Sequence, residues 1–363
     1  MSLTPIDSQF MARALRLAEQ GLYSTSPNPR VGCVLVKEGR VVGEDWHRAA
    51  GQPHAEVLAL QQAGDAARDA TCYLSLEPCS HTGRTGPCSE ALIQAGVSRL
   101  VYAMEDPNPE VAGTGLEQLE KAGIQVDGPL MQSDARALNP GFIRRMATGR
   151  PLVRVKMAIS LDGRTAMPDG NSYWVTGPKA REDVQRLRAR SCAVLSGWRS
   201  VEMDKAQMTV RPDEFGLDLG SRQPLRVLLD AQCRLPQDAR FFRAESPVLV
   251  ANLQRDDEQG HIRHVRLPEK QGHIDLHAVL DLLGQMEINE LLVESGPELS
   301  GAFMRAGLVD ELVIYMAPKL MGSNSAPLFG LPLQKMAEAL PLHFTEVRQI
   351  GGDLRITALL EKE

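Results

Sequence analysis

Four residues in the first quarter of the chain could together bind a metal ion and catalyse a hydrolysis. His54 and Glu56 lie in the segment PHAE, and Cys79 and Cys88 follow in EPCSHTGRTGPC. One imidazole and two thiolates are zinc ligands, and a site with only three of them keeps one coordination position for water. Zinc activates such a water, and Glu56 is a candidate to carry its protons. The pattern predicts one catalytic Zn²⁺ per chain.

These residues need particular places in the secondary structure. Pro53 favours a helix start, so we expect His54 and Glu56 in the entry turn of a helix. Strict helical phase would separate their side chains by about 200°, so they can share a site only if His54 keeps the freedom of a helix entry. Cys88 is expected at the start of a second helix, whose positive end favours a thiolate.

The other cysteines have a plainer interpretation. Six cysteines in 363 residues are too few for a disulfide framework. His81, inside the ligand loop, is either a substrate or supporting group or simply a loop residue. We interpret four cysteines as core residues: Cys33, Cys72, Cys192 and Cys233.

Length and composition exclude several classes of protein. The 363 residues favour two domains, and 43% hydrophobic with 24% charged residues is typical of a globular protein. The net charge of -6 argues against a nucleic-acid partner. No apolar run approaches the roughly 18 to 20 residues of a membrane helix, and the N-terminus lacks the pattern of a signal peptide. We therefore expect a cytoplasmic protein that acts on a small polar substrate, without a membrane partner.

Alternating strand and helix patterns predict two α/β domains with a boundary near residue 150, where the stretch 138–151 combines Pro, Gly and basic residues. The patterns predict strands at 31–36, 40–46, 72–77, 99–104, 152–160, 193–197, 225–230, 246–252, 290–295, 310–316 and 353–360. They predict helices at 8–20, from 54, after 88, and at 179–189, 277–286 and 299–307.

At its four candidate residues the chain resembles the cytidine deaminase-like superfamily, whose signature is His-x-Glu followed by Pro-Cys. Eight residues separate the two cysteines, where most members have two. This spacing and the segments SPNPRVGCVLV, WHRAAGQPHAE and EDPNPEVAGTG are similar to the bifunctional deaminase/reductase family of riboflavin biosynthesis. The resemblance covers most of the chain. It implies an α/β/α layered deaminase domain at 1–149 and a dihydrofolate reductase-like α/β domain at 150–363.

The resemblance also assigns roles in the first domain. It implies that Asn28 and His47 contact the pyrimidine, and that Arg84 and Thr85 hold a phosphorylated sugar. Each role suits its side chain, because an amide pairs with an edge that carries both a donor and an acceptor, and an arginine fork suits phosphate.

In the second half, the segment 291–307 has the strand, Gly-Pro turn and helix that aim backbone N–H groups at an anion, although an ordinary connection has the same form. The segment 155–191 resembles the reductase domain of the same family. Lys156, in an otherwise apolar strand, needs a partner. The resemblance implies substrate contacts at Lys156, Ser172, Arg188, Met208, Arg211 and Glu294. It implies an NADPH site at Ala158, Trp174, Ser200, Asp204, Gly296, Pro297, Glu298, Leu299, Ser300, Gly301 and Ala302.

The sequence leaves some alternatives open. Trp198, Lys205 and Ala206 are atypical of the family, so the second domain could be one that only binds nucleotide. No basic residue of the pocket segments stands out as a ligand for a 2'-phosphate, so the sequence does not decide whether the cofactor is NADPH or NADH. The first domain could instead be a nucleic-acid deaminase of the tRNA-editing type, or a zinc-stabilised interaction module with a fourth protein ligand. The family resemblance favours a phosphorylated pyrimidine as substrate and a homo-oligomer, either dimer or tetramer.

Overall fold

A computed structural model describes residues 3–80, 86–109, 111–216 and 222–360. The chain forms two compact units, Met1–Gly149 and Arg150–Glu363. Within the described residues, none of the helices is both long and apolar enough to span a membrane.

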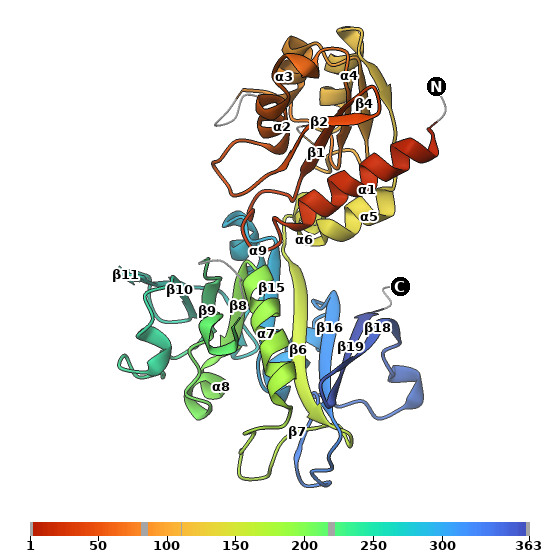
Figure 1. The fold of residues 1–363 in the computed structure, drawn as a ribbon. Coiled ribbons are helices and arrows are strands. Elements are labelled where there is room, and N and C mark those ends of the chain that lie inside the picture. The colour runs from red at the N-terminus through yellow and green to blue at the C-terminus, as the bar shows by residue number, and fades with distance from the viewer. Residues whose placement is uncertain (1–2, 81–85, 110, 217–221, 361–363) are drawn as a thin grey trace. The chain divides into compact units, whose positions relative to one another are not determined.

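The first unit has a five-stranded sheet between two layers of helices (Figure 1). Its strand order is β2-β1-β3-β4-β5, in which β1 runs antiparallel to both neighbours and β3, β4 and β5 are parallel. Apolar residues of α2, α3 and α4 cover one face, and those of α1 and α5 cover the other. The strands are β1 Gly32–Lys37, β2 Arg40–Trp46, β3 Thr71–Leu74, β4 Arg99–Tyr102 and β5 Gln125–Asp127. The helices are α1 Pro5–Glu19, α2 Ala55–Ala63, α3 Cys88–Ala95, α4 Thr114–Lys121, α5 Gln132–Leu138 and α6 Pro140–Thr148.

Two of the differences from the sequence prediction have local reasons. The first helix begins at Pro5, because Thr4 and Asp7 form a capping box. The stretch 138–151, interpreted as an irregular break, is largely helix α6. Its proline occupies a first-turn position, where no N–H is needed, and Gly149 ends the helix with a positive φ of 70°.

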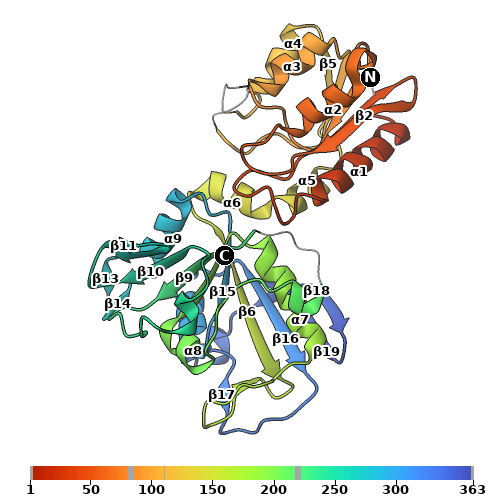
Figure 2. The same cartoon turned by 60° about the vertical axis from the view of Figure 1, so that its left-hand side comes forward.

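The second unit has a ten-stranded sheet of order β11-β12-β10-β9-β8-β15-β6-β16-β19-β18 (Figure 2). The seven strands from β12 to β16 in this order are parallel, and β11, β19 and β18 are antiparallel to their neighbours. The strands are β6 Leu152–Ser160, β7 Arg164–Ala166, β8 Ala193–Gly197, β9 Leu225–Leu229, β10 Val248–Asn252, β11 Asp257–Gln259, β12 Ile262–Arg266, β13 Glu269–Lys270, β14 His273–Ile274, β15 Glu290–Glu294, β16 Glu311–Ala317, β17 Ala326–Pro327, β18 Leu342–Ile350 and β19 Asp353–Leu360. The helices are α7 Pro178–Arg190, α8 Trp198–Met203, α9 Leu276–Gln285 and α10 Pro297–Arg305.

Helices cover both faces of this sheet. Apolar residues of α9 and α10 pack on one face, and those of α7 and α8 pack on the other. The parallel strands other than β12 are therefore largely buried on both sides, which explains their near-continuous apolar runs. Cys33, Cys72 and Cys192 are buried as expected, but Cys233 is not a core residue: it is partly exposed in the loop after β9.

A buried ion cluster joins three neighbouring strands of the second unit. Arg154 of β6 is 1% exposed and donates to Glu290 of β15 at 3.1 Å and to Glu311 of β16 at 2.9 Å. A buried guanidinium is costly unless its charge is paired and its N–H groups are hydrogen-bonded, as they are here. The cluster lies at the amino ends of β6, β15 and β16, because Glu290 and Glu311 begin their strands.

The sequence prediction missed several short or exposed strands, among them the edge strand β18. Its side chains are almost all exposed, so it lacks the apolar alternation that identifies a half-buried strand. The hairpin of β18 and β19 also exposes four large apolar side chains: Leu342, Phe344, Val347 and Leu359.

Candidate functional site

The three predicted metal ligands of the first unit come together in the structure. Their ligand atoms all lie within 4.8 Å of one another. Nδ1 of His54 is 3.2 Å from Sγ of Cys88 and 3.7 Å from Sγ of Cys79. With tetrahedral zinc at its usual bond lengths, nitrogen and sulfur ligands would be about 3.6 Å apart and two sulfurs about 3.8 Å. The donor set and its spacing therefore fit zinc.

Helix ends position these ligands. His54 is the N-cap residue of α2 with extended backbone angles of -73° and 164°, so it lies outside the helical phase of Glu56. Cys88 is the first residue of α3. Hydrogen bonds from Cys88 and His54 lower the pKa of Cys79, which favours the thiolate that a metal needs. Among the described residues the cluster contains these three ligands and no fourth.

Glu56 has the burial expected of a proton carrier. It is 3% exposed, and its Oε2 atom has no hydrogen-bond partner among the described residues. Burial raises the pKa of this carboxyl group, and the nearby Cys79 adds to the effect while His54 opposes it. A buried carboxyl oxygen without a partner is rare and indicates a site that a ligand completes.

Asn28 and His47, predicted to contact the pyrimidine, lie beside the metal ligands. Nδ2 of Asn28 is 3.0 Å from Nε2 of His47, and Nδ1 of His47 is 3.2 Å from the carbonyl oxygen of Pro53. The amide donates to Nε2, so the proton of the neutral imidazole is on Nδ1. The ring centroids of His47 and His54 are 5.3 Å apart. Arg84 and Thr85, like His81, lie outside the described residues.

Glu77 was missed by the sequence prediction and holds a loop that packs against Pro78, the residue before Cys79. It is 3% exposed, and its carboxylate accepts hydrogen bonds from the backbone N–H groups of Asp106, Gly113 and Gly115 at 3.0 to 3.1 Å. Such bonds to a carboxylate are strong. The signal was a glutamate just before the Pro-Cys pair, followed later by a glycine-rich segment.

The second unit contains a cavity of about 800 Å³. Its lining includes residues in and after the carboxyl-terminal parts of β6, β8 and β15, the side of a parallel sheet where ligands bind. Six cationic side chains and two carboxylates contribute to the described lining, which suits phosphorylated ligands. The cationic residues are Lys156, Arg181, Arg188, Lys205, Arg211 and Arg240, and the acidic ones are Asp204 and Glu294.

Glu294 joins two of the predicted substrate residues at the bottom of this cavity. It accepts from Nε and Nη2 of Arg188 at 2.6 and 3.1 Å, and Nζ of Lys156 is 3.5 Å away. Lys156 therefore has the partner that its strand position requires. Arg188 also donates to the carbonyl oxygen of Thr209 at 3.0 Å, so it is not the solvated helix residue that its arginine-rich surroundings would suggest. Arg211 lines the cavity too, but pairs with Glu214 near its rim.

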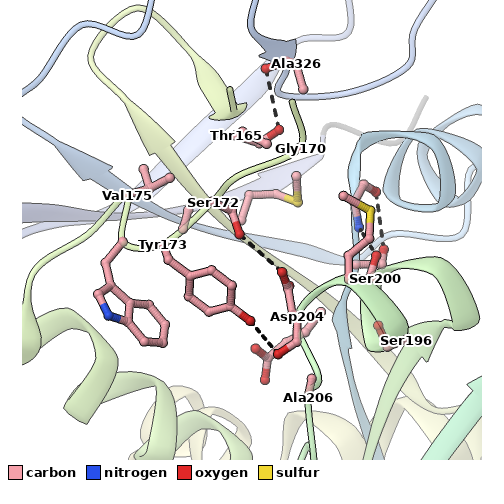
Figure 3. Close-up of a pocket in the computed structure, with 18 of the residues that line it drawn as sticks. Thr165, Gly170, Ser172, Tyr173, Val175, Ser196, Ser200, Asp204, Ala206 and Ala326 are labelled. Carbon is pink, nitrogen blue, oxygen red and sulfur yellow. Dashed lines mark hydrogen bonds between the residues drawn. The ribbon is translucent and has the colours of Figure 1, made fainter. Parts of the chain in front are cut away.

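Figure 3 shows Ser172 and Tyr173 pointing toward Asp204. The hydroxyl of Ser172 is 3.3 Å from Oδ1 of Asp204, and the phenol of Tyr173 donates to the Asp204 carbonyl oxygen. Burial raises the pKa of Asp204, while Ser172 and Lys156 act in the opposite direction. Ser172, predicted to contact the substrate, and Asp204, predicted to contact NADPH, are thus neighbours.

The Gly-Pro turn forms the strand-turn-helix predicted from the sequence. Gly296 is the N-cap residue of α10, and its N–H donates to Oγ of Ser200 at 3.1 Å. In the described structure no side chain caps the helix, so its first N–H groups can meet a pyrophosphate. Gly296 and Pro297 line the cavity with Ala158, Trp174 and Met208, whereas Glu298, Leu299, Ser300, Gly301 and Ala302 are outside the lining.

The lining includes residues that the sequence prediction did not select. Of the three atypical residues, Lys205 and Ala206 line the cavity, whereas Trp198 does not. Some of the others lie within the segments 155–191 and 291–307 that the sequence analysis singled out, and the rest are brought in by tertiary structure. The others include Thr165, Met167, Tyr173, Arg181, Gln207, Arg240, Ser295, Asn324 and Ala326.

Comparisons with known proteins match both units. Residues 4–104 match the family described as the cytidine and deoxycytidylate deaminase zinc-binding region, and residues 151–356 match the RibD C-terminal domain. The riboflavin biosynthesis protein RibD of Escherichia coli is 48% identical over 358 residues, which is 96% of this chain and 98% of that protein. The counterpart from Aquifex aeolicus is 38% identical over 97% of this chain and 98% of its own length.

Solved structures agree with these matches. A form of RibD from Acinetobacter baumannii is 42% identical, with a TM-score of 0.92 and coverage of 98% of this chain and 99% of the other. A deaminase/reductase from Thermotoga maritima is 30% identical, with a TM-score of 0.88 and the same coverage. The expected fold class, a cytidine deaminase-like domain followed by a dihydrofolate reductase-like domain, is confirmed. The chain therefore belongs to the RibD family of bifunctional riboflavin biosynthesis enzymes, which join a zinc-dependent deaminase to an NADPH-dependent reductase.

Proposed function

We propose that this chain is a cytoplasmic enzyme that catalyses two consecutive reactions. The first is the hydrolytic deamination of 2,5-diamino-6-(5-phosphoribosylamino)pyrimidin-4(3H)-one to 5-amino-6-(5-phosphoribosylamino)uracil. The second reduces the ribose of that product to the ribityl chain. The observation that carries the proposal is the cluster of His54, Cys79 and Cys88 beside the buried, unpartnered oxygen of Glu56, in a chain that also contains a cationic cavity.

In the deaminase unit, His54, Cys79 and Cys88 would hold zinc. When bound, zinc lowers the pKa of a water that it coordinates. Glu56 takes a proton from the attacking water and delivers it to the departing amine, so that ammonia leaves. Its burial supports this role, because burial raises the pKa of the carboxyl group and so makes it a better proton acceptor than an exposed glutamate.

The substrate base would lie against Asn28 and His47. The hydrogen bond between them leaves the carbonyl oxygen of Asn28 available as an acceptor for a ring N–H or amine. Arg84 and Thr85 are proposed to hold the phosphorylated sugar, on the family resemblance alone.

In the reductase unit, the proposed substrate residues are those around the Glu294 cluster. Arg188 and Arg211 would hold the ribose phosphate with Ser172, because arginine forks bind phosphate through charge-assisted hydrogen bonds. Lys156 and Glu294 face the sugar from neighbouring strands, and Met208 packs beside Arg188, with its sulfur 3.9 Å from Nη2.

NADPH supplies the hydride, and the chain orients it against the sugar. The proposed cofactor residues lie in or after the carboxyl-terminal parts of β6, β8 and β15. The cavity volume and the uncapped first turn of α10 support this placement. The set is Ala158, Trp174, Ser200, Asp204 and the turn from Gly296 to Ala302.

We further propose a homo-oligomer, dimer or tetramer, that forms through the β18 and β19 hairpin. Phe344 and Val347 are 61% and 59% exposed on this hairpin, and a sheet edge with exposed apolar residues favours pairing. Replacing Phe344 by glutamate is expected to shift sedimentation of the native species toward the monomer. An unchanged sedimentation coefficient would place the contact elsewhere.

The test of the bifunctional assignment measures ammonia release and NADPH oxidation separately, on the full-length protein. Glu56→Ala should abolish ammonia release but leave NADPH oxidation of the pre-deaminated substrate intact, and Arg211→Ala should do the reverse. Glu90→Ala and Arg263→Ala, which remove exposed side chains of the same types, serve as matched controls. Wild-type protein that releases ammonia without oxidising NADPH would refute the reductase assignment.

A further inference from the structure

Two arginine side chains lie against the ring of Trp198, one of the three residues that are atypical of the family. The guanidinium carbon of Arg199 is 5.8 Å from the Trp198 ring centroid, and that of Arg234 is 5.4 Å away. Both arginines are exposed, and in the described chain neither forms a hydrogen bond or an ion pair with another residue. Two positive charges around one ring without a carboxylate repel each other, so an anion between or beside them would be stabilised.

The fold holds these three residues at fixed places. Strands β8 and β9 are parallel neighbours, and their ends Gly197 and Leu229 are register partners. Trp198 follows the first of these ends, and the loop that carries Arg234 follows the second. Asp230, 1% exposed, accepts a hydrogen bond from the Leu235 N–H at 2.8 Å, which closes this loop.

The indole packs against the same apolar cluster that contains Leu235 and Phe241. Trp198 and the loop that carries Arg234 therefore both pack on this apolar cluster. The ring is a fixed platform, and the two arginines are the parts that can adjust to a ligand. Arginine stacks on aromatic faces and also binds phosphate through its planar fork, so this arrangement suits a phosphate on a nucleoside.

The arginine pair lies next to the proposed cofactor site. Ser196 and Ser200, on either side of Trp198 in the sequence, both line the cavity. Ser200 accepts the N–H of Gly296, the residue that begins the proposed pyrophosphate turn. Along the sheet the order is β6, β15, β8 and β9, so the pair lies beyond the turn on the side away from Lys156.

We propose that Arg199 and Arg234 bind the 2'-phosphate of the NADPH adenosine, with Trp198 as the platform between them. This inference rests on the proposed reductase function and adds the residues that select NADPH over NADH. The two cofactors differ only in that phosphate, which an arginine commonly accommodates. The Glu294 cluster places the reacting end of the cofactor near β6 and β15, which leaves the β8 and β9 end for the adenosine.

The test is calorimetric binding to the full-length protein, without turnover. The ligands are NADPH, NADH and the fragment pair adenosine 2',5'-bisphosphate and 5'-AMP. A hydrogen bond to a charged group contributes enough to change affinity by about 10-fold or more, so each single substitution to alanine should weaken NADPH by about 10-fold. Arg199→Ala combined with Arg234→Ala should weaken NADPH and the bisphosphate by about 100-fold. NADH and 5'-AMP should change by less than about threefold.

Arg263→Ala is the matched control, because it removes an exposed arginine from the outlying strand β12 of the same sheet. It should leave all four affinities unchanged. A double variant that still prefers NADPH as strongly as the wild type would overturn the inference and leave the reductase function standing. Equal affinities of the wild type for NADPH and NADH would overturn it as well. If neither dinucleotide bound the wild type, the reductase assignment itself would fail.

Discussion

Replacing Glu294 by glutamine should destabilise the second unit by about 3 kcal/mol, because it removes the counter-charge of two partly buried cations. The Glu294 side chain is 9% exposed, and it pairs with Arg188 at 2.6 Å and with Lys156 at 3.5 Å. Glutamine keeps the shape of the side chain but carries no charge. The two cations then remain in a poorly solvated place without a partner.

The size of the effect follows from the titration of Glu294. Burial raises its pKa, but the charges of Arg188 and Lys156 outweigh burial and lower the pKa from 4.5 to about 2. A pKa difference of one corresponds to about 1.4 kcal/mol, so the ionised form is favoured in the folded state by about 3 kcal/mol. Because the folded pKa is the lower one, this stability is fully present above pH 4.5 and is lost as the pH falls toward 2.

The assay is equilibrium urea unfolding at pH 7, followed by tryptophan emission, to which Trp174 and Trp198 of the second unit contribute. Glu214→Gln is the matched control. It breaks the Arg211 pair, whose two side chains are 38% and 53% exposed, and should cost less than about 1 kcal/mol. The difference between the two variants should shrink when unfolding is measured near pH 3. A loss below about 1 kcal/mol for Glu294→Gln at pH 7 would refute the reasoning.

Two further predictions concern the first unit. Gly115→Ala should destabilise this unit by about 2 kcal/mol or more and lower its zinc content, since the new Cβ would be 2.1 Å from the carbonyl oxygen of Pro78. Gly86→Ala, which meets no atom within 4 Å, is the control, and equal zinc content and melting temperature in both variants would contradict the prediction. A zinc chelator should abolish ammonia release while the melting transition of the second unit stays unchanged, because that unit has its own core. Activity that survives complete zinc removal, measured by atomic absorption, would show that the His54 cluster has another role.

The metal cluster could be predicted from the sequence because its signal is local. The spacing of His54, Cys79 and Cys88 identifies the ligands, and the prolines before His54 and Cys88 identify the two helix starts that carry them. The strand-turn-helix at Gly296 was predictable for the same reason. Where a few consecutive residues determine the backbone conformation, the sequence pattern was sufficient to predict the local structure.

Other features depend on contacts between distant segments. The partner of Arg188 comes from a strand more than one hundred residues later, and the arginines themselves resemble a solvated helix face. Strand β18 lacks an apolar pattern because both of its faces are largely exposed. The loop bonds of Glu77 and the pairing of Arg199 with Arg234 around Trp198 likewise require the sheet to be assembled first.

The buried Arg154 cluster has a consequence at the opposite end of the sheet. Strand pairs can slip by two residues without exchanging their faces, so apolar packing alone does not distinguish the correct alignment from its nearest competitor. In the native alignment Arg154 is directly opposite Glu311, and Lys156 is directly opposite Glu294. A slip of β6 by two residues would move Arg154 away from Glu311 and Lys156 away from Glu294 in the same movement. The ion pairs of Arg154 therefore favour the native register of β6. Because the same register positions Lys156 and Glu294, charges at the amino ends of these strands help to place the side chains of the cavity at the other end.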